Sequence, residues 1–89
     1  MKLETSKMRR AAVSVAANIV EGSARKNRSE YLQFLYISIS SLAELNYYIT
    51  FSNDLGYLDA KAYDELRTKG QETSRTLQGL ISYIQKSKV

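Results

Sequence analysis

One stretch of the chain, from Arg9 to Arg25, has the clearest helical pattern; it reads RRAAVSVAANIVEGSAR. At 100° per residue its apolar side chains fall on one broad arc, and its polar side chains form a narrow track at steps of three or four. The arc consists of Met8, Ala12, Val13, Val15, Ala16, Ile19 and Val20, and the track of Lys7, Arg10, Ser14, Asn18 and Glu21. Small side chains let neighbouring backbones approach closely, so the pattern predicts a central packing helix.

The boundaries of this first helix are predicted at residues 7 and 21. Thr5 or Ser6 is a suitable N-terminal cap, and the preceding residues are expected to form a frayed end. Gly22 is expected to adopt a positive φ and to stop the helix. A short basic connector then follows.

Two longer helices are predicted after the connector, over residues 28–55 and 60–86. Asn27 and Asp59 are the expected N-caps, and Gly56 is expected to close the first of the two. The chain of 89 residues contains no proline, which favours long uninterrupted helices. We therefore expect an all-α, antiparallel bundle of three helices that forms a single domain over residues 1–89.

The helix over residues 28–55 is apolar around most of its circumference. Its expected principal face consists of Tyr31, Leu35, Ile39, Leu42 and Ile49, with further apolar side chains on both flanks. Such a helix is usually buried on several sides. Because one chain of three helices offers too few neighbours to cover it, a partner is implied.

Four ordered motifs carry a family resemblance: RRAAVSVAANIVEG; Ser29-Glu30-Tyr31 leading into FLYISISSLAEL; LGYL; and LQGLISYI. From about Ser6 to Lys86 the chain resembles the 23S rRNA intervening-sequence proteins, a four-helix-bundle family. The resemblance implies a helical homo-oligomer, pentameric in known relatives, and no defined reaction. Family members usually carry another long helix before the RRAAVS segment, so the chain is expected to lack the family's first helix.

Catalytic chemistry has little support in the composition. Histidine and cysteine are both absent, which removes the commonest general base, the thiol nucleophile and the usual transition-metal ligands. The serines of YISIS have two interpretations, a catalytic nucleophile or small side chains that permit close helix contact; we favour the second, because no histidine is present to activate a nucleophile. The sequence predicts a protein that is not an enzyme, with no catalytic residues, cofactor or metal.

The positive charge is concentrated near the N-terminus. Residues 1–28 hold seven basic and two acidic side chains, a net +5, whereas the whole chain carries +4. Candidate contacts to RNA or DNA are Lys7, Arg9, Arg10, Arg25, Lys26 and Arg28. The alternative is a solvated, solubilising surface. The tyrosines lie mainly beyond residue 30 and are not interleaved with these cations, so we expect them to pack rather than to stack on bases.

The polar track supplies a second candidate site, a partly buried network of Arg10, Asn18, Glu21 and Arg25. Asn18 is unfavourable in the middle of a helix, and Glu21 lies at a helix C-terminus, where the macrodipole opposes a negative charge. Both costs indicate compensating partners, in this chain or in a neighbouring subunit. The alternative is a track that faces solvent.

Two hypotheses for function follow. The first is a non-enzymatic helical bundle that self-associates as an interaction module; the second is a nucleic-acid-binding accessory protein that uses the basic surface of residues 7–28. A third, weaker interpretation is a gene fragment that has lost its first helix and its function. No stretch reaches the roughly 18 apolar residues of a transmembrane span, and no signal-peptide core precedes Arg10, so we expect no membrane partner and a cytoplasmic location.

Overall fold

The computed structural model describes residues 2–87, and the side chains of residues 5–87. It contains three helices, α1 (Lys2–Ser23), α2 (Arg28–Asp54) and α3 (Ala60–Lys86). No strand occurs within residues 2–87, and the segment YISIS lies inside α2. The prediction of an all-α helical bundle is confirmed.

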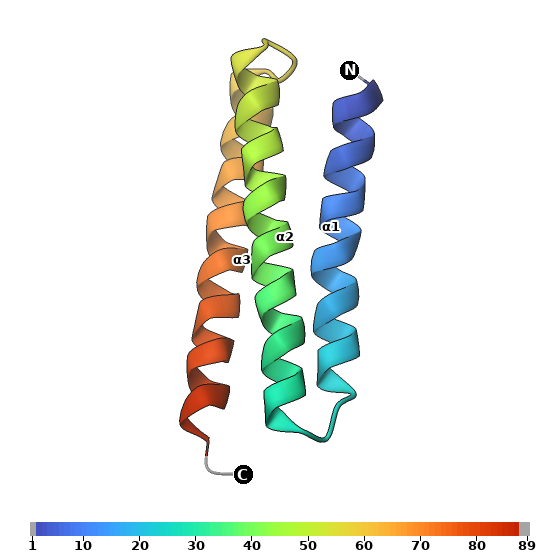
Figure 1. Cartoon of the computed structure of the whole chain (residues 1–89). Helices are drawn as coiled ribbons and strands as arrows, with labels where there is room; N and C mark the ends of the chain where they lie inside the picture. The colour runs from blue at the N-terminus through green and yellow to red at the C-terminus, as the bar shows by residue number, and fades with distance from the viewer. Residues whose placement is uncertain (1, 88–89) are drawn as a thin grey trace.

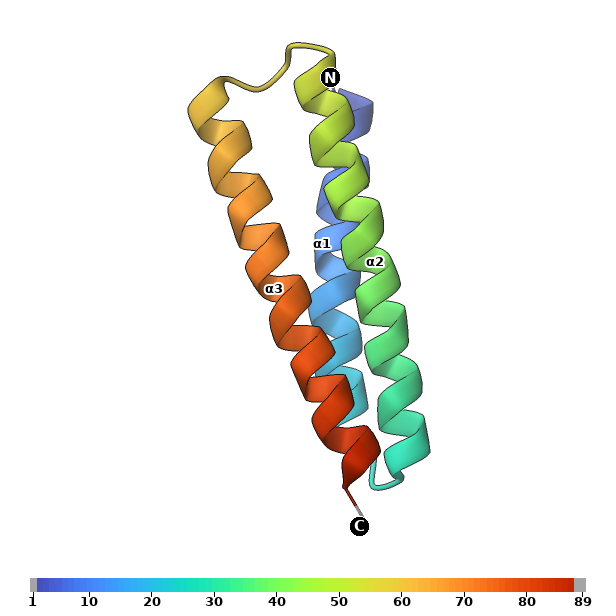
Figure 2. The same ribbon diagram turned by 90° about the vertical axis from the view of Figure 1, so that its left-hand side faces the viewer.

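Each helix runs antiparallel to the next, and α2 is the central one (Figure 1). Helices α1 and α3 both pack against α2, whereas no Cα atom of α1 lies within 8 Å of a Cα atom of α3 among the described residues. The view at 90° shows α3 diverging from α2 toward the α2–α3 turn (Figure 2). The three helices therefore form an angled layer: α2 is at the apex, and α1 and α3 form the two sides. The principal extents of the molecule are 48 × 21 × 13 Å.

The boundaries of α2 and α3 follow from local caps. The Asn27 side chain accepts hydrogen bonds from the backbone N–H groups of Ser29 and Glu30, at 2.7 and 3.2 Å. The Asp59 side chain accepts one from Ala62 N–H at 2.7 Å. Each cap satisfies donors that the first helical turn leaves unpaired. Both predicted N-caps are therefore confirmed.

The end of α2 is also as predicted, because Gly56 has a φ of +79° just beyond the helix. The Gly56 and Tyr57 N–H groups donate to the Asn53 and Ser52 carbonyls at 3.0 and 2.9 Å. These bonds satisfy carbonyl groups that the last turn leaves without an intrahelical partner. The chain then reverses into α3.

The predicted limits of α1 are wrong at both ends. The helix begins at Lys2, because lysine, leucine, glutamate and methionine are all good helix formers and nothing interrupts them, so Thr5 and Ser6 lie inside it rather than at a cap. It continues through Gly22, which does not have a positive φ, and ends at Ser23. A Cβ atom on Gly22 would lie 2.8 Å from Tyr31 Cδ1 and 2.9 Å from Phe34 Cβ. Glycine is required there for close packing against α2.

The core lies where all three helices meet. Its buried members are Val15, Leu35, Leu42, Leu77, Ile81 and Ile84. Near them the Ser38 hydroxyl, itself buried, donates a hydrogen bond of 2.8 Å to the Val15 carbonyl and so joins α2 to α1. In α3, Gly70 is buried against Asn46 of α2, so the two helices pack closely at this glycine.

Candidate functional site

The middle of the polar track of α1, Ser14 and Asn18, belongs to a hydrogen-bonded cluster at the α1–α2 interface. The hydroxyl oxygens of Ser14 and Ser41 lie 2.8 Å apart. The Asn18 amide donates to the Ser14 carbonyl at 2.8 Å and to the Ser14 hydroxyl at 3.2 Å. These bonds offset the cost of a polar amide in mid-helix. Ser41 was not among the predicted site residues, because its contact with Ser14 spans 27 positions of sequence.

Glu21 and Arg25 form a separate pair near the end of α1. Their side chains meet at 3.2 Å as an i,i+4 ion pair, with exposed fractions of 60% for Glu21 and 41% for Arg25. The guanidinium of Arg25 also lies over the Phe34 ring, 4.9 Å from its centroid. Within one chain this pair is therefore at the surface, where such pairs contribute little to stability.

Replacing Glu21 with alanine tests whether a neighbouring subunit buries the pair. In an isolated chain we expect a loss of less than about 1 kcal/mol in the free energy of unfolding, because solvent screens the pair. Burial by another copy would raise the loss to about 3–5 kcal/mol at concentrations where the protein assembles. Chemical denaturation at two protein concentrations measures both values. A small loss at both would show that the predicted network is simply solvent-facing.

Arg10 lies apart from that pair, about 16 Å along the helix axis from Glu21 at 1.5 Å per residue. It borders a recess of about 320 Å³ between α1 and α2. The other residues around this recess are Lys7, Ala11, Ser14, Ser41, Glu44 and Tyr48. The ammonium of Lys7 lies 5.8 Å from the centroid of the Tyr48 ring. The cluster around Asn18 adjoins this recess through Ser14 and Ser41, whereas Glu21 and Arg25 lie apart from both.

The predicted basic surface is divided in the same way. Lys7, Arg9 and Arg10 lie in the first half of α1, and Arg25, Lys26 and Arg28 lie around the α1–α2 connector. About 20 Å of helix without basic side chains follows Arg10, up to the end of α1 at Ser23. At the connector, the Arg28 guanidinium donates to the Ser87 carbonyl, which ties this end of the molecule to the end of α3. The cations form two groups rather than one continuous patch.

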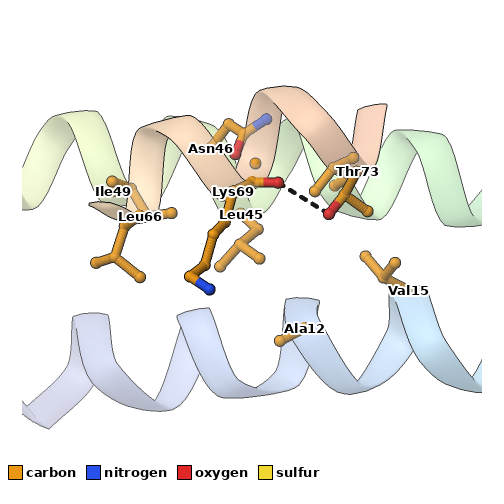
Figure 3. Close-up of a pocket in the computed structure, with 10 residues that line it drawn as sticks. Ala12, Val15, Leu45, Asn46, Ile49, Leu66, Lys69 and Thr73 are labelled. Atoms are coloured by element: carbon orange, nitrogen blue, oxygen red, sulfur yellow. Dashed lines mark hydrogen bonds between the residues drawn. The ribbon is translucent and has the colours of Figure 1, made fainter. Parts of the chain in front are cut away.

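A groove opens between α1 and α3, with α2 as its floor (Figure 3). Its volume is about 240 Å³, and its lining is mostly aliphatic. The lining residues are Ala12, Val15, Leu42, Leu45, Asn46, Ile49, Leu66, Lys69, Gly70 and Thr73. Figure 3 shows the Lys69 side chain extending from α3 toward α1 across this groove. Sequence periodicity did not indicate the groove, since it arises from the separation of α1 and α3.

Large apolar side chains are also exposed outside the groove. Val13 and Val20 of α1, which the helical arc predicts to be packed, are 60% and 66% exposed. On α2 and its C-terminal turn the exposed members are Tyr36, Ile37, Tyr47, Phe51, Leu55 and Tyr57, and on α3 they are Leu66 and Tyr83. The intramolecular core therefore uses part of the apolar surface that the sequence provides.

None of the helices in residues 2–87 is both long enough and apolar enough to span a membrane. Within the same part of the chain, no three acidic side chains gather in a way that could hold a metal ion.

Comparison with known proteins gives one clear result. No curated protein matches the chain. The sequence model of the 23S rRNA-intervening sequence proteins matches residues 3–79, which is most of its length. That range includes all of α2, nearly all of α1 and most of α3. Together with the three-helix architecture and the four motifs, this match shows that the chain belongs to the 23S rRNA-intervening sequence protein family.

Proposed function

We propose that this protein is a non-enzymatic helical module whose role is exerted through self-association into a homo-oligomer. One observation carries the proposal: all three helices expose large apolar side chains, on the outer face of α2 as well as beside the α1–α3 groove. Extensive apolar patches are unusual on monomeric proteins and typically mark interaction surfaces. The family's name states no reaction, which agrees with a structural role.

The test is the mass of the protein in solution. We expect a multiple of the chain mass of 10.1 kDa by light scattering at micromolar concentration, with five copies preferred from the family resemblance. Burial of the exposed apolar side chains supplies the driving force. A mass of 10.1 kDa that persists at all concentrations up to the millimolar range would contradict the proposal.

Nucleic-acid binding is the second candidate function. It is favoured by the exposure of Arg9, Arg10 and Lys26, none of which forms an ion pair with a described acidic residue. On this hypothesis a labelled RNA or DNA, added to the samples used for the mass measurement, binds with an affinity that falls steeply as salt increases. Alanine variants of Arg9 and Arg10 would weaken that binding and leave the mass unchanged. Binding that is absent at low salt would exclude this candidate.

A further inference from the structure

Five exposed residues form a ridge along the outer face of α2: Ile37, Ser40, Glu44, Tyr47 and Phe51. Their spacing alternates between three and four positions, the repeat by which one helix presents a seam to another. Tyr47 and Phe51 are nearly parallel, with ring planes at 10° and centroids 6.2 Å apart. Ser40 is a small residue within the ridge and allows close approach. Aromatic side chains of this kind are enriched at protein interfaces.

The groove lies on the opposite side of α2. At 100° per residue, its floor residues Leu42, Leu45 and Ile49 point about 150° away from the ridge. Helices α1 and α3 both pack on the groove side of α2, so the ridge faces away from the groove; its residues Ile37, Ser40 and Glu44 border a shallow hollow. The molecule thus carries two unlike, unpartnered surfaces on opposite sides of α2.

The charges of the two surfaces are complementary. Glu44 is at the middle of the ridge, and Lys69 reaches across the groove (Figure 3). Neither forms an ion pair within the described part of the chain. Gly70 packs directly on Asn46 and the two helices are antiparallel, so Lys69 and Glu44 lie within about 5 Å of each other along the bundle axis, a distance that their long side chains can span. Two copies stacked side by side in parallel would therefore bring the carboxylate and the ammonium together.

We propose that the α2 ridge of one copy docks into the α1–α3 groove of a second copy, with Glu44 of the first paired with Lys69 of the second. This inference rests on the proposed self-association and names the surfaces that mediate it. The interface is heterologous, since each copy uses its ridge on one side and its groove on the other. Such an interface produces a closed ring when the rotation between copies closes, and an open filament when it does not.

Charge reversal tests the pairing. Glu44→Lys and Lys69→Glu should each raise the concentration for half-assembly by more than about tenfold, because each places like charges in contact. A chain that carries both Glu44→Lys and Lys69→Glu should assemble again, since every ridge then meets a groove of opposite charge whatever the number of copies. An equimolar mixture of the two single variants should associate as well, as an open chain or an even-numbered ring, because only junctions between unlike variants pair opposite charges. Rescue separates this effect from repulsion between a new lysine and the nearby Lys7 or Arg10 of its own chain. Glu72→Lys and Arg75→Glu, both at exposed α3 positions, are the matched controls and should assemble like wild type.

Cysteine cross-linking gives a second, independent measurement, because the natural chain contains no cysteine. An ion pair between extended Glu and Lys side chains holds the two Cα atoms beyond the roughly 7 Å limit of a disulfide, so the linking reagent is a bismaleimide of matching span. With it, Glu44→Cys mixed with Lys69→Cys should give a covalent dimer, and neither variant should do so alone. A single chain carrying both substitutions should give a ladder whose largest closed species reports the number of copies.

The results of these experiments test the docking surfaces separately from self-association. If the wild type assembles but the variants give neither rescue nor cross-link, the ridge and groove are not the interface, and self-association stands. If the folded wild type is monomeric throughout, both proposals are overturned. Circular dichroism of each variant confirms that the helices are intact before the mass is interpreted.

Discussion

Replacing Leu35 with alanine should lower the free energy of unfolding by about 2–5 kcal/mol, because it removes buried methyl and methylene groups and leaves a cavity. Leu35 is 0% exposed and lies in the core cluster contributed by all three helices. Its neighbours are held on separate helices and can collapse into the cavity only in part. Urea denaturation at one fixed protein concentration measures the change, since self-association makes apparent stability depend on concentration.

Leu55→Ala provides the matched control for that measurement. Leu55 follows the last residue of α2 and is 47% exposed, so the same truncation removes much less buried surface. We expect a change within about 0.5 kcal/mol, as is usual for surface substitutions. If Leu35→Ala and Leu55→Ala lowered the free energy of unfolding equally, Leu35 would not lie in the core.

Adding one methyl group at Gly22 should also destabilise the protein, by up to about 2 kcal/mol. Alanine in place of a helical glycine stabilises a helix by about 1 kcal/mol. Here, however, the new Cβ would lie 2.9 Å from Phe34 Cβ, an atom close to the α2 backbone, so α1 and α2 must separate for it to fit. Overpacking of this kind costs roughly 1–3 kcal/mol and outweighs the gain in helix propensity.

Gly79→Ala is the control, because a Cβ atom at Gly79 would meet nothing within 4 Å. With no steric cost, the helix propensity alone should stabilise the protein by about 0.5–1 kcal/mol. Thermal or urea unfolding of the two variants should therefore shift in opposite directions. A Gly22→Ala variant as stable as Gly79→Ala would show that α1 and α2 are not in close contact there.

The sequence was most informative where structure depends on neighbouring residues. The start of α2 after Asn27 and of α3 after Asp59 agrees with the prediction, because a capping side chain bonds to N–H groups two or three residues away. Gly56 stops α2 for the same local reason. The contact between Glu21 and Arg25 is likewise local, since the two residues are four positions apart across the end of α1.

Sequence inference was least reliable where one residue type serves two purposes. Gly22 and Gly56 both follow an apolar helical segment, yet only Gly56 has a positive φ among the described residues. Gly22 is needed because Tyr31 and Phe34 of another helix lie against it. Nothing within α1 distinguishes these uses, so its C-terminal boundary was wrong.

The candidate sites show the same limit. Arg10, Asn18 and Glu21 share a helix face, and this fact alone grouped them. In the structure, Asn18 joins a cluster through Ser14, whereas Arg10 lies several turns away from Glu21. Helical periodicity predicts the direction in which a side chain points around the helix axis. It does not predict which residue of another helix that side chain contacts.

By itself, the sequence determined the number and type of helices, the caps of α2 and α3, and an apolar surface on α2 larger than one chain needs. Those properties depend on backbone hydrogen bonds and side-chain spacings within a few residues. Only the tertiary structure decided that α1 and α3 stand apart, that a groove lies between them, and that Glu44 and Lys69 lie on opposite sides at similar height. These depend on which faces pack together, and that choice is made by contacts between residues far apart in the chain.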